Sequence, residues 1–340
     1  MLENTARGDL VVLDTLCGWR TQGLGVTLAT IVHTYGSAPH EIGALYAINA
    51  QGDEVGALAG TCLGAWIKDR MQGARGLRPR IETVSGTDEI FLPCGGRVVF
   101  LVENNLGPSH LREWRSALAA RKSLYRIVDA VSGEYALIPT PSGARSKWTG
   151  RFWLGAYGAT WRLLLVGGGA VSTELALMAR SLDFAITVSE PRGELRAAFP
   201  PGLATVTEAM PDDAVASMPP DCRTAVLALA HDPRLDDLAL WEAAPSAAFY
   251  VGALGSAATH AKRRARLLGL GVDPAAVARI RGPAGIPINS HTPPEIAVSI
   301  AAALVAERRR APLLAPHCFP DPIDNEVLLH DHRIVVGGGA

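Results

Sequence analysis

Three consecutive glycines, Gly167, Gly168 and Gly169, lie between a short apolar run and an alanine-rich segment of helical period, and Glu190 ends the next apolar run. In a parallel strand-helix-strand unit such glycines let the backbone approach a ligand, while the helix N-terminus offers free N–H groups to a phosphate. An acid at the tip of the second strand is placed to hold a ribose hydroxyl. The segment therefore predicts a nucleotide-binding fold, with Ser172 standing where the fingerprint has its third glycine. The fold alone does not decide whether a nucleotide binds there.

A second glycine turn follows later in the chain. The apolar run 224–230 ends in His231, and the run 248–251 leads directly into Gly252–Ser256 and then a basic helix that carries Arg263. With strand order 3-2-1-4, we expect turns 167–169 and 252–255 to face each other across one crevice, with His231 on the same edge. Gly255, Ser256 and Arg263 then predict an anion site, because a glycine turn and a basic face occur together. The alternative is that the basic face is simply solvated.

Two cysteines lie against glycines in the N-terminal part of the chain. Cys62 begins a predicted helix that runs to Met71, and a helix N-terminus stabilises a thiolate and lowers the thiol pKa. Cys94 lies in the turn 93–96, directly before a predicted strand at 97–103. Both could be reactive thiols. The alternative is a small buried residue, since cysteine is often buried and no His–carboxylate pair stands obviously nearby.

The loop 33–43 is unusually polar and contains Gly36, Ser37 and Pro39 between two strand-like runs, 26–33 and 45–48. A wide hairpin turn and a ligand-binding loop are both consistent with this composition.

These segments belong to an ordinary globular chain. It has 340 residues, of which 48% are hydrophobic and 19% charged, and its net charge of -1 gives no reason to expect nucleic acid or membrane as a partner. No apolar run is long enough to cross a bilayer, and the N-terminal residues lack the pattern of a secretory signal. Five cysteines without CxxC spacing favour a cytoplasmic protein with reduced thiols.

The order of the predicted elements indicates an α/β protein, with a smaller N-terminal α+β domain and a C-terminal Rossmann-like parallel-sheet domain. We place the first domain and a polar connector at 1–157, the Rossmann-like domain at 158–310 and a tail at 311–340. The tail contains His317, Cys318, His330 and His332. We expect it to be flexible rather than to hold a metal.

Seven segments in this order together resemble the XdhC/CoxI family, the accessory proteins that mature molybdenum hydroxylases: 30–44, 57–65, 93–103, 163–176, 228–236, 249–267 and 279–304. The resemblance implies a chaperone that binds the molybdenum cofactor, as molybdopterin or its cytosine dinucleotide form. It implies that the protein protects the cofactor while a cysteine desulfurase supplies sulfur, and then inserts it into an apo molybdenum hydroxylase of the xanthine dehydrogenase or aldehyde oxidoreductase type. A homodimer is the expected assembly.

The resemblance also assigns residues to a cofactor site. Cys62 and Cys94 match the family's two glycine-flanked cysteines, and the loop of Gly36, Ser37 and Pro39 matches its GSxP motif. The glycine turns at 167–169 and 255–256 match the Rossmann part. Three positions depart from the family pattern: Gly60-Thr61-Cys62-Leu63-Gly64 lacks one glycine and an acid, and His40 replaces a basic residue.

Two other functions compete with this interpretation. An NAD(P)-dependent oxidoreductase would use the crevice between residues 167 and 256, with His231 as acid or base. In that case Glu190 favours an unphosphorylated ribose, although the neighbouring Arg192 complicates the choice. A structural partner protein with a vestigial crevice is the third possibility, and a missing ligand effect on stability would support it.

Overall fold

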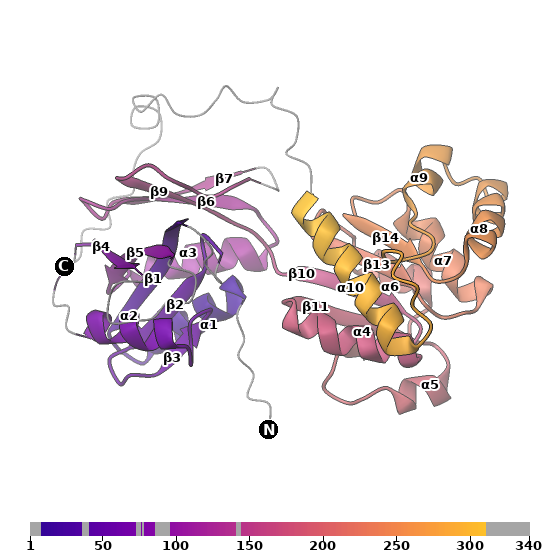
Figure 1. Cartoon of the computed structure of the whole chain (residues 1–340), viewed down its shortest axis with the longest axis horizontal. Coiled ribbons are helices and arrows are strands. Elements are labelled where there is room, and N and C mark those ends of the chain that lie inside the picture. The colour runs from indigo at the N-terminus through magenta and orange to yellow at the C-terminus, as the bar shows by residue number, and fades with distance from the viewer. Residues whose placement is uncertain are drawn as a thin grey trace. The chain divides into compact units, whose positions relative to one another are not determined.

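A computed structural model of the protein describes residues 8–35, 41–72, 76, 78–85, 96–140 and 144–310. These residues form two compact units, an N-terminal unit that ends at Ala159 and a C-terminal unit that spans Thr160–Ala311 (Figure 1).

The C-terminal unit is built on a parallel five-stranded sheet, as the sequence predicts. Its strand order is β12-β11-β10-β13-β14, so the direction of winding reverses between β10 and β13. The strands are β10 (Trp161–Val166), β11 (Phe184–Ser189), β12 (Thr205–Thr207), β13 (Thr224–Ala228) and β14 (Tyr250–Ala253). The helices are α4 (Ala170–Ser181), α5 (Gly193–Ala198), α6 (Pro211–Ser217), α7 (Pro233–Ala243), α8 (Ala257–Gly269), α9 (Pro274–Arg279) and α10 (Pro293–Arg310).

Both faces of this sheet are buried, which explains why its strands are apolar throughout. Within β10, Leu163 and Leu165 pack with α4 and α10, whereas Leu164 and Val166 pack on the opposite face with α6, α7, α8 and α9. This alternation follows from the two-residue period of a strand. It leaves the ends of the strands as the part of the sheet that can meet a ligand.

Helix α10 begins with a capping box, whose Thr292-x-x-Glu295 spacing can be read in the sequence. The Glu295 carboxylate accepts hydrogen bonds from the N–H groups of His291 (2.8 Å) and Thr292 (2.9 Å). The helix lies beside α4 (Figure 1), and its Ile300 and Leu304 are fully buried in the core that α4 shares. Its apolar face therefore belongs to the core of the unit. No helix in the described part of the chain is long and apolar enough to cross a membrane.

One strand boundary in this unit was predicted wrongly, and two short helices were not predicted. The strand β14 continues through Ala253, so Gly252 lies inside it and forms a bridge with Arg281. The helices α5 and α9 occupy segments that carry no clear sequence signal, since each has only six residues.

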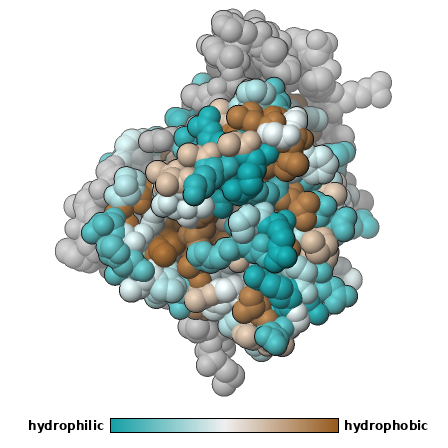
Figure 2. Space-filling model, turned by 90° about the vertical axis from the view of Figure 1, so that its right-hand side faces the viewer, coloured by the Kyte–Doolittle hydropathy of each residue, from teal (hydrophilic) through white to brown (hydrophobic). Residues whose placement is uncertain are grey.

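Figure 2 looks onto one face of the molecule, where hydrophilic residues surround separate apolar areas.

The N-terminal unit contains two antiparallel sheets, with strand orders β3-β2-β1-β5-β4 and β7-β6-β9-β8. The first sheet consists of β1 (Val26–Tyr35), β2 (Leu45–Asn49), β3 (Glu54–Gly56), β4 (Arg80–Ser85) and β5 (Arg97–Asn104). The second consists of β6 (Leu124–Asp129), β7 (Tyr135–Pro139), β8 (Lys147–Trp148) and β9 (Phe152–Tyr157). The helices are α1 (Asp9–Thr21), α2 (Cys62–Gln72) and α3 (Pro108–Ala119).

The polar segment that we expected to be a connector contains β8 and β9. Strand β9 pairs with β6 over its whole length, and its second residue, Trp153, is fully buried. The glycine and polar residues around this short run hide its strand character, because the pairing is made with a strand far away in sequence. On the first sheet, α2 covers one face with Trp66 and Ile67, and α1 and α3 contribute to the core on the other face.

A buried polar network joins the two sheets of this unit. Arg126 of β6 has no exposed surface and donates two hydrogen bonds to Glu103 of β5, at 2.8 and 2.7 Å. Its Nε donates to Nε2 of His110, at 3.1 Å, and the His110 ring stacks on Tyr135. Burial, with Arg126 adding to it, lowers the pKa of His110 to about 2, so this imidazole is neutral in the folded protein.

Candidate functional site

The glycine turn after β10 divides into a part that the fold requires and a part that is open. Gly167 is buried with φ of +98°, and a Cβ there would lie 2.5 Å from Cα of Ala230. A Cβ on Gly168 would lie 3.3 Å from Cγ of Glu190. Gly169 is different: it is the N-cap of α4, and a Cβ there would meet nothing within 4 Å. A ligand can therefore approach at Gly169 and the first turn of α4, where no side chain caps the helix.

Glu190 binds the glycine turn through its buried carboxylate. It is fully buried; one carboxylate oxygen accepts from the Gly168 N–H (2.8 Å) and Arg192 Nη2 (2.7 Å), and the other from the Arg192 N–H (2.9 Å) and Nε (2.7 Å). Burial alone raises the pKa of Glu190, but these hydrogen bonds outweigh it and hold the pKa below its ordinary value. A carboxylate has about four acceptor positions, and all four are used.

Arg192 lies across the edge of the sheet where the winding reverses. While Nε and Nη2 bind Glu190 at the end of β11, Nη1 points to the carbonyl oxygen of Ala230 after β13, at 3.5 Å. The side chain is 37% exposed. Arg196 fixes the same loop, because its Nη1 donates to the carbonyl oxygens of Glu190 (3.1 Å) and Pro191 (3.0 Å). The guanidinium of Arg192 is thus held beside Ala230, the residue against which Gly167 packs.

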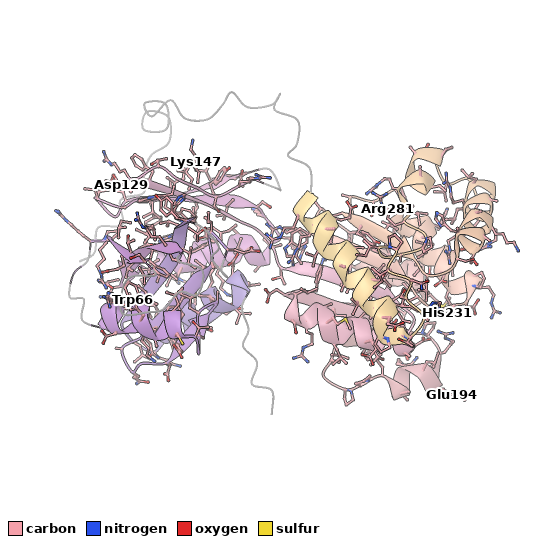
Figure 3. The ribbon with its side chains drawn as sticks, in the orientation of Figure 1. Trp66, Asp129, Lys147, Glu194, His231 and Arg281 are labelled. Carbon is pink, nitrogen blue, oxygen red and sulfur yellow. The ribbon has the colours of Figure 1, made fainter. Side chains whose placement is uncertain are left out.

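His231 is exposed on the same edge and has a left-handed backbone, with φ of +57°. In Figure 3, His231 and Glu194, which follow β13 and β11, lie near the same end of the unit. The neighbouring Ala230 N–H donates to Asp236 of α7, at 3.0 Å. Burial raises the pKa of Asp236, against the hydrogen bond from Ala230 and the charge of Arg263.

The second glycine turn lies one strand further along the sheet than we expected. β13 separates β10 from β14, so turn 167–169 meets Ala230 and does not face the turn at Gly255. Ser256 caps α8 by accepting the Thr259 N–H, at 3.2 Å. Arg263 is 3% exposed, donates to the Leu254 carbonyl (3.0 Å) and lies 3.5 Å from the Asp236 carboxylate.

These contacts connect the two turns through a polar chain. It runs from Glu190 and Arg192 to Ala230, then to Asp236, and from there to Arg263 and Leu254. Sequence reasoning did not name Asp236 as a site residue, and it considered Arg192 only as a complication for the choice of ribose. The available signal was the position of each: Arg192 follows Glu190 by two residues, and Asp236 lies in the first turn of the helix after β13.

In the N-terminal unit, Cys62 is the first residue of α2 and its thiol is free and exposed. The preceding Thr61 hydroxyl accepts the Gly64 N–H (2.9 Å) and donates to the Leu58 carbonyl (2.8 Å). A Cβ at Gly64 would lie 2.0 Å from that carbonyl oxygen, so the close turn requires glycine where the family pattern has an acid. The local departure thus has a structural cause.

Several predicted positions lie outside the described residues: Gly36, Ser37, Pro39, Cys94 and the tail residues His317, Cys318, His330 and His332. Within the described ranges, no group of three or more His, Cys, Asp and Glu side chains could hold a metal ion.

Comparison with known proteins agrees with this architecture. The model of the XdhC Rossmann domain matches residues 163–304, and the model of the XdhC and CoxI family matches residues 19–85. The chain belongs to the XdhC and CoxI family. The C-terminal match covers the polar chain, and the N-terminal match covers Cys62.

Two relatives of this XdhC-family chain extend the comparison. The molybdenum cofactor insertion chaperone PaoD of Escherichia coli (strain K12) is 27% identical over 290 residues, which are 84% of each chain. A crystal structure of a xanthine dehydrogenase from Bacillus halodurans superposes with a TM-score of 0.73 at 25% identity, covering 91% of this chain and 98% of the other. The resemblance inferred from the sequence motifs is thereby confirmed.

Proposed function

We propose that this protein binds the molybdenum cofactor, protects it during sulfuration and inserts it into a molybdenum hydroxylase of the xanthine dehydrogenase or aldehyde oxidoreductase type. The relationship to an insertion chaperone over most of both chains is the observation that carries the proposal. A cysteine desulfurase, the apo hydroxylase and a second copy of the chain are the proposed partners. The free thiols of Cys17, Cys62 and Cys222 support a cytoplasmic location.

The described residues fit an anionic cargo. The uncapped first turn of α4, open at Gly169, suits the phosphate of a pterin cofactor, and Arg192 supplies a positive charge beside it. Within the N-terminal unit itself, the exposed thiol of Cys62 suits sulfur and metal chemistry. The cofactor brings the molybdenum; the protein's own residues would bind it and exclude water and oxygen. Other residues stay proposed cofactor-binding residues, each within its own unit: Gly36, Ser37, Pro39 and Cys94 in the N-terminal unit, and His231, Gly255, Ser256 and Arg263 in the C-terminal unit.

The competing oxidoreductase proposal is weakened by Glu190. In that proposal the acid holds the ribose of NAD, but here its carboxylate oxygens already accept four hydrogen bonds. An unperturbed NAD-type site would leave at least one of these oxygens for the ribose. The two proposals differ in whether Glu190 contacts the ligand, and the co-purification experiment described next separates the two functions.

The test is anaerobic co-purification from cells that make the molybdenum cofactor, followed by metal analysis and oxidation of bound pterin to its fluorescent form. We expect molybdenum and pterin in near-stoichiometric amounts. Transfer is then measured by adding the loaded protein to an apo hydroxylase and following the recovery of activity. A preparation without pterin that instead binds NAD(P) tightly would contradict the chaperone proposal and support the oxidoreductase.

A further inference from the structure

We propose that Arg192 is the residue that binds an oxyanion in the Rossmann crevice, and that Glu190 positions this arginine instead of reading a ribose. The ligand class is a phosphate or pyrophosphate ester, such as the diphosphate of a nucleotide. The inference rests on the proposed function, since it concerns the phosphate of the cargo in the same crevice.

The first argument concerns the acid. Glu190 has no exposed surface. Its oxygens accept from the backbone N–H groups of Gly168 and Arg192 and from Nε and Nη2 of Arg192, all within 2.9 Å. A ribose hydroxyl could be accommodated only by breaking one of these charge-assisted bonds. Glu190 therefore affects ligand binding only indirectly, by positioning Arg192.

The second argument concerns the arginine. A guanidinium has five N–H donors, and Glu190 takes the edge formed by Nε and Nη2. The contact from Nη1 to the Ala230 carbonyl is long, at 3.5 Å, and the side chain is 37% exposed. The end of the fork, Nη1 and Nη2, therefore retains N–H groups that match the geometry of two phosphate oxygens.

The third argument concerns position. Arg192 connects the ends of β11 and β13, and the glycine turn of β10 lies between these two strands. The N–H groups at the start of α4 and the guanidinium therefore belong to one edge of the sheet, the point at which doubly wound folds bind ligands. A Cβ at Gly169 would meet nothing within 4 Å, so the start of α4 is accessible to such a group.

The experiment compares two arginines on this edge. Arg192→Met removes the proposed ligand contact. Arg234→Met is the matched control, because Arg234 is 89% exposed and pairs with Asp232 at the start of α7. Binding of inorganic pyrophosphate, cytidine 5′-diphosphate and its 2′-deoxy form is measured by calorimetry on the full chain, and circular dichroism checks folding. Arg192→Lys is the second variant, which keeps the charge but not the two-pronged contact with Glu190.

We expect Arg192→Met to weaken binding of pyrophosphate and of the nucleotide by about tenfold or more, and Arg234→Met by less than about twofold. Arg192→Lys should retain part of the affinity. The nucleotide and its 2′-deoxy form should bind within about twofold of each other, because the acid does not contact the ribose. Glu190→Gln should lower the affinity for pyrophosphate, which lacks a ribose, since the arginine loses its anchor.

Three results would overturn the inference: no binding of any probe to the wild-type protein, equal losses in the two arginine variants, or a tenfold preference for the 2′-hydroxyl. The outcome is separable from that of the proposed function. Cofactor that co-purifies equally with wild type and Arg192→Met would leave the chaperone proposal intact and refute the role of Arg192. Pyrophosphate binding that depends on Arg192, without cofactor in the purified protein, would do the reverse.

Discussion

Substitution of two glycines in the same turn, Gly167 and Gly169, should have different effects on stability. Gly167→Ala places a methyl group 2.5 Å from Cα and 2.8 Å from N of Ala230, where ordinary contacts are about 3.5–4 Å. The backbone φ of +98° adds a conformational cost of about 1–2 kcal/mol for a residue with a Cβ. Overpacking against a backbone that must shift adds about 1–3 kcal/mol. We therefore expect a loss of about 2–5 kcal/mol in the free energy of unfolding of the C-terminal unit.

Gly169→Ser is the matched control. Its backbone is extended, with φ of −75°, and the added side chain meets nothing within 4 Å. Serine is also a better N-cap than glycine, by a few tenths of a kcal/mol, so this variant should be as stable as wild type or slightly more so. Because it fills the open space above α4, it should also weaken anion binding.

Urea unfolding, with hydrogen exchange of peptides from β10 and β13 to report on the C-terminal unit alone, measures both effects. With a dependence of roughly 2 kcal/mol per molar urea, the Gly167→Ala midpoint should fall by about 1–2.5 M. A Gly167→Ala variant within about 1 kcal/mol of wild type would refute the reasoning, because it would show that the turn can move away from Ala230 at little cost. Equal destabilisation of both variants would refute it too.

Three further predictions concern the N-terminal unit. The pKa of His110 is about 2 in the folded protein and near 6.5 in the unfolded chain, so between these pH values only the unfolded state binds a proton on this residue. The unfolding free energy should therefore fall by about 1.4 kcal/mol for each pH unit below about 6, and His110→Gln should flatten this slope in pH-dependent urea titrations. Glu103→Gln leaves the buried Arg126 without a charged partner and should lower the unfolding free energy by about 3–5 kcal/mol in the same assay. Asp14→Asn, in the exposed pair with Arg115, should change the unfolding free energy little. Similar losses in the two variants would contradict the role of burial. Cys62→Ala should change the unfolding free energy by less than about 0.5 kcal/mol, because the side chain is exposed, yet lower the pterin retained on anaerobic purification; unchanged retention would remove this thiol from the site.

The sequence predicted the C-terminal sheet well because a doubly wound unit leaves local signals. Each buried strand is a short apolar run, and each helix follows it with its own period, so the order of strands follows from the fold class. The start of α10 was predictable for the same reason, since Thr292 and Glu295 act within one turn. Two strands of the second N-terminal sheet, β8 and β9, were missed because β9 is stabilised by pairing with β6, and nothing in its own residues predicts that partner.

The positions that sequence reasoning placed incorrectly depend on which strands are neighbours. Turns 167–169 and 252–255 look equivalent in sequence, since both follow an apolar strand and precede a helix. The intervening β13 gives only the first of them a place at the point where the winding reverses. Arg263 similarly belongs to a basic stretch, yet it turns inward to Asp236 and Leu254. Composition alone does not distinguish a solvated arginine from a buried one.

Glu190 shows how one residue type at one spacing supports two different chemistries. An acid at the end of the second strand is placed to accept a ribose hydroxyl, and its oxygens are free to do so only if no donor of the protein saturates them. Arg192, two residues further, supplies that donor, and burial makes the pair costly to separate because an unpaired charge would remain. An arginine two residues after the acid therefore says more about the ligand than the glycine fingerprint does. A member of the family with a shorter side chain at the arginine position should recover a carboxylate that can read ribose.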